Sequence, residues 1–205
     1  MGETGVIGIL RVESPEVCLK VIDALVEGGV IALEVTTTTP DAIQTIAKAK
    51  GKHGDEAVIG MGTVLDGATA EKGILAGAQF VVSPSLHKDV LDACVKHHVV
   101  GCPGTFTATE IVQAWRWGAD LIKVFPAAAV GPGYIRSILA PLPWVKLVPT
   151  GGIDVHNAAQ FIKAGSFCVG VGGALVSTNA TATGRYDLIT SAARDLIAAI
   201  KSARA

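Results

Sequence analysis

The sequence predicts a (β/α)8 barrel, the TIM-barrel architecture, as a single domain over residues 1–205. Eight short apolar segments of strand composition alternate with eight segments of helical pattern, and strict alternation implies a parallel sheet with right-handed crossovers. A glycine between a helix and an even-numbered strand recurs at Gly29, Gly77, Gly118 and Gly165. Eight βα units close into a barrel, and about 200 residues is the compact end of that fold's range. No linker or shift of composition divides the chain.

Each predicted strand is rich in valine, isoleucine, leucine or phenylalanine, as in a parallel sheet that is covered on both faces. The strands are expected over residues 5–10, 30–36, 57–62, 79–83, 99–102, 120–125, 145–149 and 167–171. Ser14 is expected to cap the first helix, with Pro15 at its first position, and Gly51 is expected to end the second helix. The helices are expected over residues 15–26, 41–50, 87–97, 107–117, 132–139, 154–164 and 185–203, with one more that ends at residue 76.

The composition points to a small-molecule ligand. Half of the residues are hydrophobic, 17% are charged, and the formal net charge is −1, with no basic run that would bind nucleic acid. The longest uncharged run, residues 164–184, is too rich in Gly, Ser, Thr and Asn for a membrane span. No basic segment precedes an apolar one at the start, so no secretory signal is expected. We expect a cytoplasmic protein, or an organellar one if a targeting extension has been removed.

Cysteine and histidine give no sign of a metal site. The four cysteines stand far apart in apolar surroundings, which favours buried free thiols in a reducing compartment. They are Cys18, Cys94, Cys102 and Cys168. No metal-like spacing joins the five histidines, so no metal and no other cofactor is expected.

A lysine stands in the sixth predicted strand. Alternation puts Leu121, Lys123 and Phe125 on one face of this strand and Ile122 and Val124 on the other. Both faces are largely apolar, so Lys123 is expected to be buried, and burial without a partner favours the neutral amine. A neutral amine can attack a carbonyl carbon and form a Schiff base. The alternative is a lysine whose stem packs in the barrel while its head reaches water.

A glutamate stands in the second predicted strand. Ala32, Glu34 and Thr36 share one face of this strand, and the bulky Leu33 and Val35 share the other. The bulky face is expected to meet the helices, so the small and acidic face should point into the barrel. This arrangement would place Glu34 near the lysine of the sixth strand.

Other candidate residues follow the carboxyl ends of the predicted strands, where barrel enzymes have their active sites. The substrate-binding candidates are Arg11, Thr63, Pro84, Phe125, Thr150, Gly151, Gly152, Gly172 and Gly173. The glycines lie in two loops after the seventh and eighth strands, where backbone N–H groups can approach a phosphate closely.

Lys123, Glu34 and Arg11 together suit the cleavage of a carbon–carbon bond. The arginine can hold a substrate carboxylate, the lysine can attack a keto carbon, and the glutamate can move protons. The resulting iminium accepts the electrons of the bond that breaks. The alternative is a structural ion pair between Glu34 and Lys123, although a buried pair is weak evidence for stability.

At these residues the sequence resembles the KDPG/KHG aldolase family of bacteria. These class I aldolases act on 2-keto-3-deoxy-6-phosphogluconate (KDPG) and 4-hydroxy-2-oxoglutarate (KHG). The matching segments occur in order and at the family's spacing over nearly the whole chain. They are residues 9–11, 33–36, 60–64, 83–84, 102–104, 122–126, 149–153 and 170–172.

The resemblance implies a role for each candidate. Lys123 is similar to the Schiff-base lysine, and Glu34 to the general acid/base that moves protons through water. Arg11 and Thr63 would hold the carboxylate of the pyruvoyl group. Phe125 would pack beside the Schiff base, and Pro84 would shape the wall of the pocket. Thr150 and the glycines of the two loops would bind the rest of the substrate, including a distal phosphate. The family is typically trimeric, cytosolic and metal-free.

Three features differ from the family pattern. Some members carry an arginine for the substrate carboxylate two residues after the Glu-Val-Thr motif, where this chain has Thr37 and Thr38. Many members carry a serine in the last phosphate loop, at the position of Gly173. Members usually also have a helix before the first strand, where this sequence has only about four residues.

Two other functions fit the predicted fold. A phosphate-sugar isomerase or epimerase would need acid/base residues but no covalent lysine. A non-catalytic barrel would keep Lys123 and Glu34 for structure alone. The expected function is nevertheless a class I aldolase that releases pyruvate from KDPG, from KHG or from both, as a homotrimer.

Overall fold

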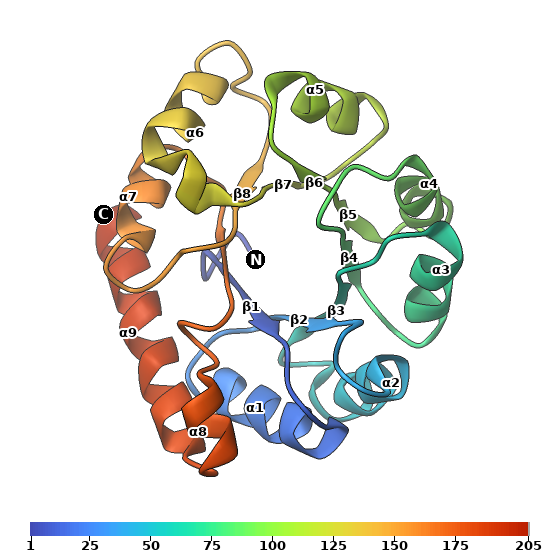
Figure 1. Ribbon diagram of the computed structural model, residues 1–205, viewed down its shortest axis with the longest axis vertical. Helices are drawn as coiled ribbons and strands as arrows, with labels where there is room; N and C mark the ends of the chain where they lie inside the picture. The colour runs from blue at the N-terminus through green and yellow to red at the C-terminus, as the bar shows by residue number, and fades with distance from the viewer. Residues whose placement is uncertain (205) are drawn as a thin grey trace.

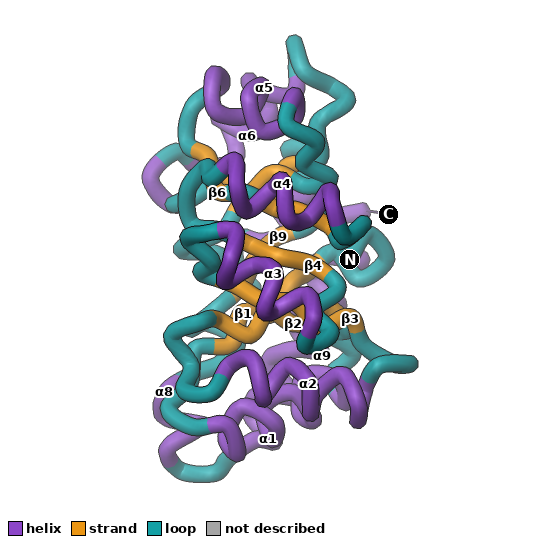
Figure 2. Tube along the Cα trace, turned by 90° about the vertical axis from the view of Figure 1, so that its right-hand side faces the viewer, coloured by secondary structure: helices purple, strands orange, loops and turns teal. Residues whose placement is uncertain are grey.

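The computed structural model describes residues 1–204 as a closed ring of parallel strands inside a ring of helices (Figure 1). The strands are β1 (Val6–Leu10), β2 (Ala32–Thr36), β3 (Val58–Gly62), β4 (Phe80–Val82), β5 (Val100–Cys102), β6 (Gly104–Thr105), β7 (Ile122–Val124), β8 (Leu147–Pro149) and β9 (Val169–Val171). The turned view in Figure 2 shows the strands in the middle of the molecule and the helices outside them. The predicted (β/α)8 barrel is confirmed.

The strands form eight staves. Hydrogen bonds order them as β5-β4-β3-β2-β1-β9 and as β6-β7-β8. Strands β5 and β6 are one stave interrupted at Pro103, which has no N–H group to donate. Two contacts join β8 to β9 and close the ring. They are a bridge between Thr150 and Gly170 and a hydrogen bond of 3.0 Å that the amide of Phe167 donates to the carbonyl of Leu147.

The helices cover the outside of the barrel in chain order. They are α1 (Pro15–Glu27), α2 (Ala42–His53), α3 (Gly67–Leu75), α4 (Lys88–Lys96), α5 (Ala108–Arg116), α6 (Gly131–Leu139), α7 (Ala158–Lys163), α8 (Thr178–Ala182) and α9 (Tyr186–Arg204), with a 3-10 turn at Ala127–Ala129. Most of these match the sequence-based prediction within a few residues.

Three helix predictions were wrong. The second helix does not end at Gly51 but continues to His53, because one glycine inside a helix costs only about 1 kcal/mol. The helix predicted from residue 154 starts at Ala158, because Asp154 instead accepts backbone bonds from the turn at His156 and Asn157. The short helix α8 was missed, because no helix was expected between the last strand and residue 185.

Two apolar layers give the barrel its stability. Side chains inside the ring form one buried cluster, which consists of Ile7, Ala32, Phe80, Val82, Cys102, Leu121, Val148 and Cys168. Leu33 and Val35 belong to a larger cluster between strands and helices, so the bulky face of β2 meets the helices as predicted. All four cysteines are buried free thiols.

The repeated glycine that precedes alternate strands has a structural reason. Gly29, Gly77, Gly118 and Gly165 have φ angles of 88°, 107°, 90° and 103°. A residue with a Cβ rarely adopts these angles, so glycine ends the helix and turns the chain into the next strand.

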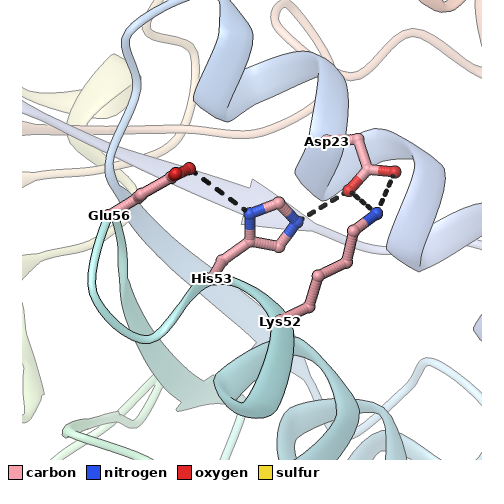
Figure 3. Close-up of polar contacts among 4 residues, drawn as sticks. All are labelled: Asp23, Lys52, His53 and Glu56. Carbon is pink, nitrogen blue, oxygen red and sulfur yellow. Dashed lines mark hydrogen bonds and ion pairs between the residues drawn. The ribbon is translucent and has the colours of Figure 1, made fainter.

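A polar cluster joins two neighbouring outer helices (Figure 3). Asp23 of α1 faces Lys52 and His53 of α2, with oxygen–nitrogen distances of 2.6 and 2.7 Å. Glu56 lies 3.8 Å from the other ring nitrogen of His53. Burial alone would raise the pKa of Asp23, but the hydrogen bonds from Lys52 and His53 outweigh it and lower that pKa. The cluster therefore stabilises the packing of α1 on α2 while Asp23 is ionised.

Candidate active site

A cavity of about 530 Å³ opens at the carboxyl ends of the strands. All eleven residues proposed from the sequence line it: Arg11, Glu34, Thr63, Pro84, Lys123, Phe125, Thr150, Gly151, Gly152, Gly172 and Gly173. The volume lies within the range of small-molecule sites. The fold therefore brings together residues from seven of the eight staves, because parallel strands end at the same edge of the barrel.

Lys123 lies in the middle of β7, and only 7% of its surface is exposed. Its neighbours Ile122 and Val124 point into the outer cluster, so strand alternation turns the lysine into the ring. Its Nζ atom lies 5.0 Å from the ring centroid of Phe125, which is itself partly exposed at the mouth of the cavity. The amine is thus screened from bulk water but open to a molecule in the cavity.

Glu34 projects from β2 into the same cavity, with 2% of its surface exposed. Burial raises the pKa of its carboxyl group, while the positive charges of Lys123 and Arg11 act in the opposite direction. The net pKa is raised, so this carboxyl group keeps its proton to a higher pH than an exposed glutamate does. A buried carboxyl group with a raised pKa beside a reacting centre is suited to giving and accepting protons there.

The position of Glu34 depends on a glycine of the neighbouring strand. Gly62 stands at the carboxyl end of β3, in register with Thr36 of β2. A Cβ atom at Gly62 would overlap the carboxylate of Glu34, and it would lie 2.5 Å from the Cγ atom of that side chain. The bare backbone of β3 therefore provides the room that the carboxylate occupies.

Within the described part of the chain, no ion pair neutralises the ionisable groups of the cavity. None of the ion pairs formed among residues 1–204 includes Glu34, Lys123 or Arg11. The structure thus gives no support to a direct structural salt bridge between Glu34 and Lys123. Arg11 is exposed at the mouth of the cavity, where a guanidinium without a partner can receive a carboxylate.

The opposite wall of the cavity is built from the two glycine loops. Gly151 and Gly152 follow β8 with φ angles of 92° and 73°. A Cβ at Gly152 would lie 2.5 Å from the Cβ of Ala128, whereas a Cβ at Gly173 would meet nothing within 4 Å. Close backbone approach thus requires glycine at residue 152, and residue 173 has room for a side chain.

Sequence reasoning missed several residues of this wall. The cavity is also lined by Ile9, Ile153, Asp154, Gly170, Ala174, Val176 and Thr178. Thr178 begins the helix α8, which was not predicted. Asp154 was expected only as the first residue of a helix, but it lines the cavity while its carboxylate accepts from the amides of His156 and Asn157. Its position two residues after the glycine pair that follows β8 was the signal that could have found it.

A thiol lies inside the ring beneath the charged groups. Cys102 ends β5 and belongs to the inner cluster. Burial raises the pKa of this thiol far above its usual value, with Cys168 and Glu34 adding to the rise and Lys123 opposing it. Cys102 is therefore protonated and acts as an apolar residue.

Within residues 1–204, no group of three or more His, Cys, Asp or Glu side chains is placed to hold a metal ion. The same part of the chain has no helix of the length and apolar character needed to cross a membrane.

Comparison with known proteins identifies the family. A family model described as KDPG and KHG aldolase matches residues 1–192. The chain belongs to this family. It is 36% identical over 167 residues to 2-dehydro-3-deoxy-6-phosphogalactonate aldolase of Escherichia coli K12, covering 81% of this chain and 80% of that protein. It is 35% identical over 198 residues to the KHG/KDPG aldolase of the same organism, covering 96% and 92%.

The fold of the aldolase matches a solved relative closely. It superposes with a TM-score of 0.88 on the KDPG aldolase of Legionella pneumophila, at 31% identity and covering 95% of this chain and 97% of that one. That structure holds pyruvate captured at low pH as a covalent carbinolamine intermediate. The chain is thus an aldolase, a lyase of carbon–carbon bonds, and the predictions of family and enzyme class are confirmed.

Proposed function

We propose that the chain is a Schiff-base aldolase that releases pyruvate from a 2-keto-4-hydroxy acid, with KDPG as its principal substrate. The observation that carries this proposal is the presence of a buried lysine and a buried glutamate in one cavity, neither of them in an ion pair with any of residues 1–204. Chemistry on a keto acid needs a nucleophile, a proton carrier and a carboxylate holder. Lys123, Glu34 and Arg11 supply these three functions.

The reaction begins at the amine of Lys123. Its lone pair attacks the C2 carbonyl carbon of the substrate, and the oxygen takes up a proton to give a carbinolamine. Loss of that oxygen as water leaves an iminium. The bond between C3 and C4 then breaks, the hydroxyl group on C4 loses its proton and becomes an aldehyde, and the bonding electrons move into an enamine. Protonation at C3 and addition of water release pyruvate and restore the lysine.

Glu34 carries the protons of these steps. Its carboxyl group can donate a proton when the carbinolamine loses water and, once ionised, can accept the proton of the C4 hydroxyl group. A water molecule between the carboxyl group and the reacting atoms would transmit both transfers. The raised pKa of Glu34 suits the donating step, because burial keeps this carboxyl group protonated to a higher pH than an exposed glutamate.

Arg11 and Thr63 are proposed to hold the carboxylate next to the reacting carbonyl. Both residues line the cavity. Arg11 supplies the positive charge that some family members provide with an arginine in the region where this chain has Thr38. Phe125 packs against the stem of the Schiff base, and Pro84 shapes the adjoining wall. The carboxylate would thereby orient C2 toward the amine of Lys123.

The glycine loops are proposed to receive the phosphate of KDPG. Gly151, Gly152, Gly172 and Gly173 present backbone to the cavity, and backbone N–H groups bind phosphate without side-chain help. Thr150 directly precedes Gly151 and lines the same cavity, and it is proposed to contact the carbon chain of the substrate. The cavity extends from Lys123 to these loops, as a six-carbon phosphorylated acid requires.

A second substrate, KHG, is favoured by one specific observation. Among residues 1–204, the part of the cavity lining that follows β8 and β9 includes no lysine or arginine, includes Asp154 and has no side chain at residue 173. A negative charge near the phosphate position weakens phosphate binding. KHG, which yields pyruvate and glyoxylate, ends in a carboxylate with less charge than a phosphate.

Pyruvate release from each acid tests the proposal. We expect wild type to cleave KDPG and KHG, and Lys123→Met to cleave neither while keeping its thermal stability. Comparable turnover in folded Lys123→Met would contradict the covalent mechanism. A preference for KHG of more than tenfold in kcat/KM would replace KDPG as the principal substrate.

We further propose that the protein acts as a cytoplasmic homotrimer. Two exposed aromatic side chains support a subunit contact: Trp115 of α5 and Trp144 before β8 have ring centroids 5.8 Å apart. Paired tryptophans on the surface are typical of interfaces. Light scattering of the pure protein measures the state directly, and a monomer at micromolar concentration would contradict the proposal.

A further inference from the structure

Four consecutive threonines follow Glu34 and Val35 of β2. This threonine run (residues 36–39) occupies the region where some family members have a carboxylate-binding arginine. Hydroxyl groups cannot replace the charge of an arginine. Their hydrogen bonds show a different use, because they reach the backbone of the two residues that flank Arg11 and the backbone of Thr63.

The first of these residues is Arg11. No ion pair holds its guanidinium among residues 1–204, so within that part of the chain the backbone is what fixes the point from which the side chain reaches into the cavity. The buried hydroxyl group of Thr36 donates to the carbonyl of Leu10 at 2.9 Å. Thr39 makes two longer contacts, donating to the same carbonyl at 3.5 Å and accepting from the amide of Val12 at 3.4 Å. Threonines thus hold the backbone on both sides of Arg11.

The second residue is Thr63, whose backbone is in an unusual conformation. Its φ angle is 60°, in the left-handed region, although a β-branched side chain disfavours that region strongly. Residues in such conformations persist only where the surroundings hold them, and they concentrate at functional sites. The hydroxyl group of Thr37 donates to the carbonyl of Thr63 at 2.9 Å, and the amide of Thr37 donates to the carbonyl of Gly62 at 2.9 Å.

The two halves of the run are connected to each other. The hydroxyl groups of Thr36 and Thr38 lie 2.9 Å apart, so the contact to Leu10 continues along the loop. We propose that the threonine run is a positioning element, which sets the backbone at Arg11 and Thr63 so that both can hold the carboxylate of a 2-keto acid. This inference rests on the proposed function. It makes these threonines positioning residues, which themselves need not contact the substrate.

The test compares two carbonyl compounds in borohydride trapping of the lysine. Pyruvate has a carboxylate, and acetone has the same reacting carbonyl without one. Intact mass gives the trapped fraction at each concentration, and hence the half-saturating concentration, for wild type, Thr37→Val and Thr37→Ser. We expect the half-saturating pyruvate concentration of Thr37→Val to be about tenfold higher than that of wild type, which is the effect of one misplaced hydrogen bond to a charged group. The half-saturating acetone concentration should be unchanged. Thr37→Ser keeps the hydroxyl group and should restore the wild-type value.

Two further variants complete the design. Thr36→Val should show the same selective loss through Arg11, with Thr36→Ser as its rescue. Thr190→Val is a matched control, because it removes a hydroxyl bond of 3.0 Å to the carbonyl of Ala24 between α9 and α1, away from the cavity. It should leave both half-saturating concentrations unchanged. Thr37 is only half-buried in a loop, so its variants should fold even if those of Thr36 do not.

The outcomes separate the inference from the proposed function. No adduct on wild type at any pyruvate concentration would refute the Schiff-base function itself. If wild type is trapped but Thr37→Val has a wild-type pyruvate requirement, the positioning role is wrong. An equal loss for pyruvate and acetone would also overturn it, because that result would show a general structural effect and no effect on the carboxylate.

Discussion

Gly62 offers a way to disturb the catalytic glutamate without changing its charge. An alanine at this position places a Cβ where the carboxylate of Glu34 lies, 2.5 Å from its Cγ atom. Optimal carbon–carbon separation is about 3.5 Å, so the side chain must move by about 1 Å. A misplacement of about 1 Å can cost about 100-fold in rate. We therefore expect Gly62→Ala to lower kcat by about that factor.

Steady-state release of pyruvate measures the loss, and pyruvate trapping should still label the lysine of Gly62→Ala. The control is Gly51→Ala, since a Cβ at that exposed position of α2 meets nothing within 4 Å. This variant should keep wild-type kcat and gain about 0.5 to 1 kcal/mol of stability from the better helix former. Wild-type turnover in folded Gly62→Ala would refute the placement of Glu34 as the proton carrier.

Three other changes have effects that follow from the structure. Glu34→Gln should lower turnover by about 100-fold or more while unfolding at a higher temperature than wild type at pH 8. The reason is that the folded-state pKa of Glu34 is raised: its carboxyl group contributes full stability below its unfolded pKa of about 4.3 and loses that stability as the pH rises through the folded-state pKa. A lower melting temperature of Glu34→Gln than of wild type at pH 8 would contradict this. Asp23→Asn should lower the free energy of unfolding by at most about 1 kcal/mol at pH 7, because the ion pair of Asp23 with Lys52 is largely exposed. The pKa of Asp23 is depressed in the folded state, so this contribution is present above the unfolded pKa of about 3.9 and is lost as the pH falls through the folded-state pKa. Urea unfolding at pH 7 and pH 3 measures both values, and an equal cost at the two pH values would exclude the ion cluster as the cause. Gly173→Ser should lower KM for KDPG about fivefold through one added hydrogen bond and leave KM for KHG unchanged, because a side chain has room there; an equal change for both acids would argue against a phosphate position at this loop.

The fold could be predicted because its signals are local and repeated. Apolar strands and helix-ending glycines recur along the chain, and the four glycines before alternate strands all have positive φ angles. The period of two in β2 and β7 was enough to turn Glu34 and Lys123 into the ring. The gathering of the predicted site residues around one cavity then follows from the parallel arrangement of the strands.

Features that depend on contacts between distant segments could not be predicted. One stave is divided into β5 and β6 at Pro103, and whether the missing N–H group interrupts a strand depends on which amides of that strand bond to its neighbours. The left-handed backbone of Thr63 has no signal in its own sequence, because Thr37, from another strand end, holds its carbonyl. Thr178 lines the cavity from the start of α8, a helix of only five residues that is too short to show a helical period in the sequence.

The central claim is that Lys123 forms the covalent intermediate. Incubation of wild type with pyruvate and borohydride, followed by intact mass and peptide mapping, tests it directly. We predict one pyruvate-sized adduct per chain, located on Lys123 and absent from Lys123→Met. An adduct on another lysine, or no adduct on the folded wild-type protein, would contradict the account.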